Sequence, residues 1–206
     1  MISLRTFGLY VLLACPVLVS SHPYESHLPP ATPGIFKAEA YAVIDAPIDK
    51  VWEVLLDFPS YPKWNPFARK MVITNMMGTP LEDQTPRENA RLRIEAQIPP
   101  MKRPVNENQR SGLLSSQTSM ENVTLIDHEN YICAWQAIQL PPPLLAATRY
   151  SALSVVQTPD GPRTLYESRE IFGSVISIVL ALLMAGNVQK GFEEQALALK
   201  ELLESS

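Results

Sequence analysis

The sequence predicts an α+β domain in which a long C-terminal helix lies across one face of a curved antiparallel sheet. Two observations predict this fold. Six runs with strand character follow one another between residues 68 and 172, and from residue 174 to residue 203 the pattern changes to a helical period. With 46% hydrophobic and 18% charged residues, the 206-residue chain can bury one core of ordinary size.

A first strand and two short helices are expected before these runs. Residues 36–45 read as the strand, and Pro47 suits the first turn of a helix because its missing N–H has no partner there. The helix then has an apolar face at the i, i+3, i+4 and i+7 spacing, formed by Ile48, Val51, Trp52 and Leu55. Pro59 ends it, and the stretch PSYPKWNPF predicts a second short helical turn and a loop.

The later strands are expected to pair in sequence order. Residues 88–98 alternate between apolar and polar side chains, which is typical of a half-buried antiparallel strand. Residues 115–127 and 131–138 flank a short turn. Residues 147–157 and 163–172 flank Asp160-Gly161, a strong hairpin signal.

The terminal helix has two different halves. In the second half, Phe192, Ala196, Leu199 and Leu203 share one face. The first half is apolar on nearly all sides, and residues 171–189 contain no charge. This half is interpreted as a buried helix, with a transmembrane segment or an interface of a membrane-bound protein as alternatives.

The N-terminus has the pattern of a secretory signal. Arg5 precedes an apolar run from Phe7 to Val19, and small residues follow. We therefore expect residues 1–21 to be a signal peptide or a membrane anchor, residues 22–34 a linker, and residues 35–206 the folded domain. This places the protein in the secretory pathway, secreted or associated with the endoplasmic reticulum, or else anchored in a membrane through its N-terminus. Asn122 begins the one glycosylation sequon.

Composition excludes several classes of function. A net charge of −4 without a basic run argues against nucleic-acid binding. The sequence has no zinc-ligand spacing and no phosphate-binding glycine loop. We expect neither a metal nor an organic cofactor. Cys133 lies in a strand-like run, where a buried small apolar side chain is the usual interpretation.

Three stretches carry a resemblance to a known family. IDAPIDKVWEVLLDFPSYPKWNPF (residues 44–67) is similar to the start of the START-like, or SRPBCC, helix-grip (START/Bet v 1-like) superfamily, and especially to its polyketide cyclase/dehydrase and lipid-transport group. YESREIFGSV resembles that group's Glu-x-Phe-x-Gly strand end, with a spacing one residue tighter here. GFEEQALALKELLE resembles its closing helix. The resemblance implies about seven strands wrapped around the helix and an apolar ligand cavity between them.

In such a fold, the aromatic loop after the first helix borders the cavity entrance. The resemblance therefore implies that Tyr61, Trp64 and Phe67 form apolar walls for a hydrophobic small molecule. Asn65, Tyr131 and Trp135 are further candidates for lining residues. The alternative for all of these aromatic residues is that they simply complete the core.

Polar side chains on inward strand faces are the candidates for catalysis. Tyr166 and Glu170 share one face of the last strand, and Arg149 lies on its hairpin partner. A carboxyl in an apolar cavity has a raised pKa and can act as an acid or a base near neutral pH. An arginine beside it can hold a carboxylate or an enolate oxygen. The alternative is a structural Glu–Arg pair.

Two functions remain open at this point. The first is a polyketide cyclase or dehydratase of secondary metabolism, which promotes ring closure with Glu170, Arg149 and Tyr166. The second is a carrier of a lipid, sterol or other apolar molecule without catalysis. Both take a hydrophobic small molecule as partner, and both suit a monomer or a homodimer.

Overall fold

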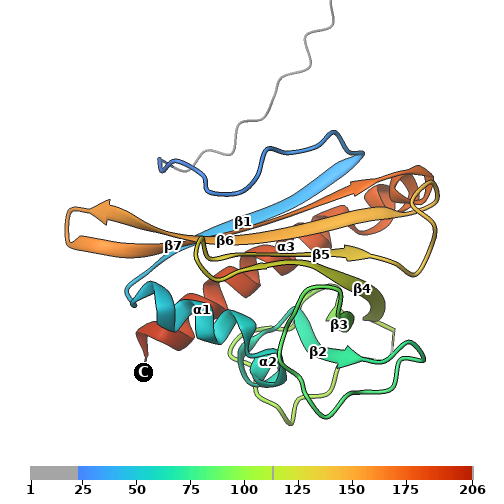
Figure 1. Cartoon of the computed structure of the whole chain (residues 1–206), viewed down its shortest axis with the longest axis horizontal. Coiled ribbons are helices and arrows are strands. Elements are labelled where there is room, and N and C mark those ends of the chain that lie inside the picture. The colour runs from blue at the N-terminus through green and yellow to red at the C-terminus, as the bar shows by residue number, and fades with distance from the viewer. Residues whose placement is uncertain (1–22, 113, 206) are drawn as a thin grey trace, which may run out of the picture.

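Seven antiparallel strands form one curled sheet, and a long helix crosses its concave face (Figure 1). The computed structural model describes residues 23–112 and 114–205. The strand order is β1-β7-β6-β5-β4-β3-β2, so β1 and β2 are the two edges. The strands are β1 (Phe36–Ile44), β2 (Ala68–Thr74), β3 (Arg91–Gln97), β4 (Ser116–Asp127), β5 (Ile132–Ala137), β6 (Ala146–Thr158) and β7 (Gly161–Gly173). The predicted helix-grip fold is confirmed.

The helices after the first strand are also where the sequence predicts them. α1 (Ile48–Leu56) buries Val51, Trp52 and Leu55, while Pro47 is its N-cap rather than its first helical residue. A 3-10 turn, η1 (Phe58–Ser60), and the single turn α2 (Tyr61–Trp64) follow. Both have a proline in their first turn, where a backbone donor is not needed.

The long helix α3 (Val175–Glu204) packs on the sheet with its C-terminal half. Phe192, Ala196, Leu199 and Leu203 are buried, as their helical spacing predicts. Three of them, Ala196, Leu199 and Leu203, join residues of α1, α2 and the inner sheet face in the main apolar core. The core therefore fills the end of the sheet that lies beside α1.

The N-terminal half of α3 is not a fully buried helix. Val175, Leu182 and Leu183 are exposed, whereas Leu180 and Met184 face the sheet and are only partly exposed. By length and composition, α3 is apolar enough to cross a membrane. Its C-terminal half is nevertheless part of the protein core, so it is unavailable to lipid.

The segment before β1 follows the outer side of β7. The backbone N–H of His27 donates to the Glu167 carboxylate at 2.9 Å, and Arg169 donates to the Pro29 carbonyl. The predicted linker is thus attached to the sheet over its described part. The predicted signal peptide or anchor at residues 1–21 lies outside the described residues.

Candidate functional site

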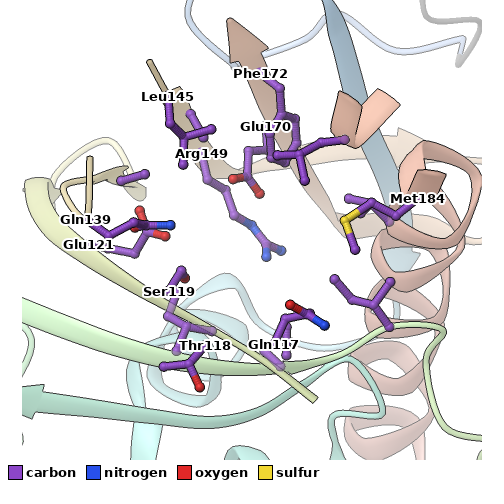
Figure 2. A pocket seen from close by; sticks show the side chains of 18 of the residues that line it. Gln117, Thr118, Ser119, Glu121, Gln139, Leu145, Arg149, Glu170, Phe172 and Met184 are labelled. Atoms are coloured by element: carbon purple, nitrogen blue, oxygen red, sulfur yellow. The ribbon is translucent and has the colours of Figure 1, made fainter. Parts of the chain in front are cut away.

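A cavity of about 190 Å³ lies between the sheet and the N-terminal half of α3 (Figure 2). Aromatic and aliphatic side chains form most of its wall, including Phe36, Phe67, Trp135, Phe172 and Met184. The polar lining residues are Gln117, Thr118, Ser119, Glu121, Gln139, Arg149 and Glu170. Such a mixture suits a largely apolar ligand that carries one or a few polar groups.

Strand register brings three of the lining residues together. Arg149 on β6 is the direct partner of Glu170 on β7 and of Trp135 on β5. Directly opposed residues of antiparallel strands point to the same face of the sheet. All three side chains therefore enter the cavity from adjacent strands, and Figure 2 shows Arg149 and Glu170 side by side there.

The Arg149 side chain is held from one side and is free on the other. It is 5% exposed, and its Nε donates to Ser168 Oγ at 3.0 Å. Its guanidinium carbon lies 4.1 Å from the centre of the Phe192 ring and 5.7 Å from that of Trp135, a cation–π arrangement. Its Nη2 has no hydrogen-bond partner. A buried guanidinium N–H without an acceptor can bind an oxygen of a ligand.

Glu170 is a carboxyl group close to its titration midpoint at neutral pH. Burial raises its pKa from 4.5 to about 7, and the Arg149 charge opposes part of this increase. A carboxyl with this pKa can accept or donate a proton under physiological conditions.

Glu121 on β4 is a second cavity carboxyl, which the sequence interpretation missed. It is 5% exposed, and its pKa is raised to about 8, first by burial and then by the negative charge of Glu170. A hydrogen bond from Ser119 and the Arg149 charge oppose this increase. The sequence contains a signal for this position: Glu121 is two residues from Val123 and therefore shares its strand face, and in the structure both side chains are buried.

Tyr166 does not line this cavity. It is fully buried in the main core, four residues before Glu170 on the same strand face. Gln195 Nε2 donates to its hydroxyl oxygen at 3.2 Å. Its position therefore does not support the catalytic role predicted for it, because α3 packs over this part of the sheet and covers the Tyr166 side chain.

The predicted ligand-binding residues divide into two groups. Phe67 and Trp135 line the cavity, as expected. Tyr61 and Trp64 are core residues, with ring centres 4.8 Å apart, and the Tyr61 hydroxyl donates to the Leu55 carbonyl at 2.8 Å. Tyr61 and Trp64 therefore complete the core, which is the alternative stated for these aromatic residues.

Asn65 and Tyr131 also lie away from the cavity lining. Asn65 is buried, and its Oδ1 accepts hydrogen bonds from the backbone N–H groups of Phe67 and Ala68, both at 2.9 Å. It therefore shapes the turn that leads into β2. Tyr131 has a φ of 53° at the β4–β5 turn, and its hydroxyl donates to Asp49.

The predicted glycosylation site lies within a paired strand. Asn122 is opposite Arg91 on β3 and Gln136 on β5, so it is not in the surface loop that a sequon favours.

Cys133 is fully buried, and burial raises the pKa of its thiol to about 12. Among residues 23–112 and 114–205, no group of three or more His, Cys, Asp or Glu side chains could hold a metal ion.

This arrangement defines a helix-grip domain with a mostly apolar cavity between the sheet and α3. The model of the family described as "Polyketide cyclase / dehydrase and lipid transport" matches residues 36–204. The chain belongs to that family. No curated protein matches the sequence.

Solved structures share the fold at low sequence identity. Ginseng major latex-like protein 151 from Panax ginseng is 9% identical, with a TM-score of 0.56, and the match covers 82% of this chain and 97% of that one. A START superfamily protein from Mycobacterium smegmatis is 16% identical, with a TM-score of 0.51 and coverage of 82% and 97%. The di-domain ARO/CYC protein BexL from the BE-7585A biosynthetic pathway is 14% identical, with a TM-score of 0.50, and the match covers 82% of this chain and 47% of BexL. At these identities, the likeness concerns the fold alone.

Proposed function

We propose that this protein binds a polyketide-type intermediate in the cavity and promotes its cyclisation, followed by loss of water, without a cofactor. The observation that carries the proposal is the unpartnered Nη2 of buried Arg149 beside two carboxyls, Glu170 and Glu121, whose pKa values are raised toward neutrality. Family membership and the likeness to an ARO/CYC protein support this choice.

The chemistry begins at a carbon next to a carbonyl group. The Glu170 carboxylate removes a proton from this carbon, and the C–H electron pair moves onto the carbonyl oxygen as an enolate. Arg149 Nη2 donates a hydrogen bond to that oxygen, which stabilises the developing charge in a site of low dielectric constant. The apolar walls hold the chain folded, so that the reaction is effectively unimolecular.

Ring closure and dehydration then use both carboxyls. The enolate carbon attacks a second carbonyl carbon of the same chain and forms a C–C bond, and protonated Glu121 gives its proton to the new alkoxide. In the dehydration step, the Glu121 carboxylate removes a proton from the carbon next to the alcohol. Glu170, now protonated, gives its proton to the departing hydroxyl, which leaves as water. Both carboxyls return to their starting protonation states, so no oxidant or reductant is needed.

The experiment compares the small molecules made by a strain that lacks the gene with those of the complemented strain. We expect the deletion strain to accumulate an uncyclised or hydrated precursor, and Glu170→Gln to fail to restore the product. A loss of about 10²–10⁴-fold in rate is typical for removal of a general acid–base group. Glu95→Gln is the matched control, because Glu95 lies on β3 beside Lys70 and Arg93, each at 3.7 Å, outside the cavity. Full restoration by Glu170→Gln would contradict the catalytic role.

The second candidate function is a carrier of a lipid, sterol or similar apolar molecule. The specific observation in its favour is the exposed apolar surface of α3 beside the cavity. In this case, the deletion leaves small-molecule products unchanged and alters the distribution of lipids, and Glu170→Gln behaves as wild type.

A further inference from the structure

The first half of α3 carries an exposed apolar stripe. It consists of Val175, Ile178, Val179, Leu182 and Leu183, at the i, i+3, i+4, i+7 and i+8 spacing of one helical face. Leu182 is 83% exposed and Leu183 is 74% exposed. Single exposed apolar residues are common on proteins, but a contiguous group of large ones indicates an interaction site.

The loop between β5 and β6 extends this surface. Ile138, Leu140 and Leu144 are exposed on it. Two hydrogen bonds join the loop to the start of α3: the Ile176 N–H donates to the Leu144 carbonyl at 3.1 Å, and Ser174 Oγ donates to the Pro142 carbonyl. Leu144 therefore lies beside the start of the α3 stripe, and we call the stripe together with Leu144 the apolar face.

The apolar face lies next to the cavity. Leu180 and Met184 line the cavity from the same helical turns that expose Val179, Leu182 and Leu183, and Leu145 lines it from the same loop as Leu144. In Figure 2, Leu145 and Met184 lie on two sides of the cavity. The apolar face therefore lies on the outer side of the cavity wall to which Leu180, Met184 and Leu145 contribute.

Charge distribution indicates what covers this face. Residues 171–189 contain no charged side chain, and residues 132–148 contain none either. The protein as a whole carries a net charge of −4, which disfavours attraction to anionic surfaces. The large exposed side chains of the apolar face are all aliphatic, without the aromatic or arginine residues that form the centre of most protein–protein interfaces.

We propose that the apolar face docks on the surface of a zwitterionic lipid bilayer, with the N-terminal half of α3 lying in the interface and the cavity opening toward the lipid. A helix with one apolar face inserts that face among the acyl chains while its other face remains on the protein. Here, the other face lines the cavity, and the C-terminal half of α3 is fixed in the core. The proposal goes beyond the catalytic one: docking on a bilayer is what a carrier requires, and it is also compatible with an enzyme that takes an apolar substrate.

The test places an environment-sensitive fluorophore on the face in the full chain. The background carries Cys15→Ser, while Cys133 remains because it is fully buried and unreactive. One variant adds Leu182→Cys for labelling with a nitrobenzoxadiazole dye. The control variant adds Val155→Cys, since Val155 is 56% exposed on β6 near the hairpin at the opposite end of the sheet from α3's start (Figure 1). Because each label reports its own position, binding through the N-terminal apolar segment does not mimic the result.

We expect phosphatidylcholine vesicles to give a blue-shifted, several-fold stronger emission from the label at position 182 and no change at position 155. The response should persist in 0.5 M salt (roughly a 4 Å Debye length), because no charge pairing is involved. Adding Leu183→Glu should abolish it, while circular dichroism stays unchanged because this side chain is exposed.

Three outcomes would overturn the proposal. The first is an unchanged emission at position 182 with phosphatidylcholine vesicles. The second is a response only to anionic vesicles that disappears with salt, which would assign binding to charged groups elsewhere. The third is an emission change that follows protein concentration without vesicles, together with a dimer in light scattering that Leu183→Glu converts to a monomer. In that case, the face is an interface between two copies of the chain.

Discussion

Arg149 and Glu170 are direct cross-strand partners on β6 and β7, and both side chains point into the cavity. Their relationship is not that of a simple ion pair. The Arg149 charge lowers the pKa of Glu170, but burial raises this pKa more. The pKa of the carboxyl is therefore about 7, close to neutral pH. The guanidinium meanwhile donates to Ser168 and retains an unpartnered Nη2. The pair therefore offers a proton acceptor and a hydrogen-bond donor to the same part of a ligand.

The raised pKa of Glu170 predicts that stability falls as the pH rises. The unfolded chain releases this proton near pH 4.5 and the folded chain only near pH 7, so the folded state holds more protons between these values. The contribution of Glu170 to the free energy of unfolding should thus be largest below about pH 4.5 and should decrease as the pH rises through 7. Relative to Glu170→Gln, the wild type should lose on the order of 2 kcal/mol between pH 5 and pH 8.

Urea unfolding of both proteins at several pH values measures this difference. Glu95→Gln serves as the control, because Glu95 is outside the cavity. If the free energy of unfolding of the wild type and of Glu170→Gln changed with pH in parallel, burial would not raise the pKa of the Glu170 carboxyl.

Arg149→Met should weaken ligands that carry an oxygen acceptor. Methionine keeps much of the apolar contact with Phe192 but removes the charge and the free donor. A hydrogen bond to a charged group is worth about 1.5–3 kcal/mol, which corresponds to a loss of roughly 10–100-fold in affinity. Titration with an anilinonaphthalene sulfonate dye provides the measurement. Arg87→Met, at an exposed ion pair with Asp83, is the control.

The same substitution should raise the pKa values of both cavity carboxyls. Arg149 lowers the pKa of Glu121 and of Glu170, so its removal leaves burial less opposed. Carbon-13 NMR titration of the glutamate side-chain carboxyls measures the change. Unaltered titration midpoints would mean that the guanidinium does not act on these carboxyls.

Gly191→Ala should reduce both stability and cavity volume. A Cβ at this position would overlap the ring of Phe67, which lines the cavity. Overpacking of this kind costs about 1–3 kcal/mol and pushes the ring toward the empty space. Gly186→Ala on the same helix is the matched control, because nothing lies within 4 Å of its Cβ position.

For this control, we expect a gain of roughly 0.5–1 kcal/mol from the better helix propensity of alanine. Thermal unfolding and dye binding compare the two variants. Equal stabilities would indicate that Phe67 does not pack against Gly191.

Asn65→Ala should lower stability and leave ligand specificity unchanged. The variant removes the acceptor of two buried backbone N–H groups, those of Phe67 and Ala68, at a cost of about 1–3 kcal/mol. Asn65→Asp keeps both acceptor positions and should recover most of the loss. Urea midpoints measure the recovery. A change in ligand preference at unchanged stability would instead favour the ligand contact that the sequence predicts.

The aromatic segment from Tyr61 to Phe67 illustrates how far sequence patterns extend. Its composition predicts a short helical turn, and the family resemblance implies that the segment borders a cavity; α2 and the wall residue Phe67 are there. The same composition cannot separate wall from core, because Tyr61 and Trp64 are as apolar and as large as Phe67. Their places depend on how the turn packs against the sheet and α3, which involves contacts distant in sequence.

By itself, the sequence determined the order and type of the elements and which residues share a strand face, because these follow from local periodicity. The choice of the Glu170 face as the inward one depended in part on the family resemblance, and Arg149 and Glu170 both line the cavity. Only the tertiary structure decided which inward residues meet. Curvature of the sheet carries Glu121 on β4 to the same cavity as Glu170 on β7, while α3 covers Tyr166 and leaves Glu170 at the cavity wall. It also decided that the uncharged half of α3 exposes one apolar face, since the sheet beneath covers only the other. Burial and proximity between strands are properties of packing, and these set the pKa values on which the proposed chemistry depends.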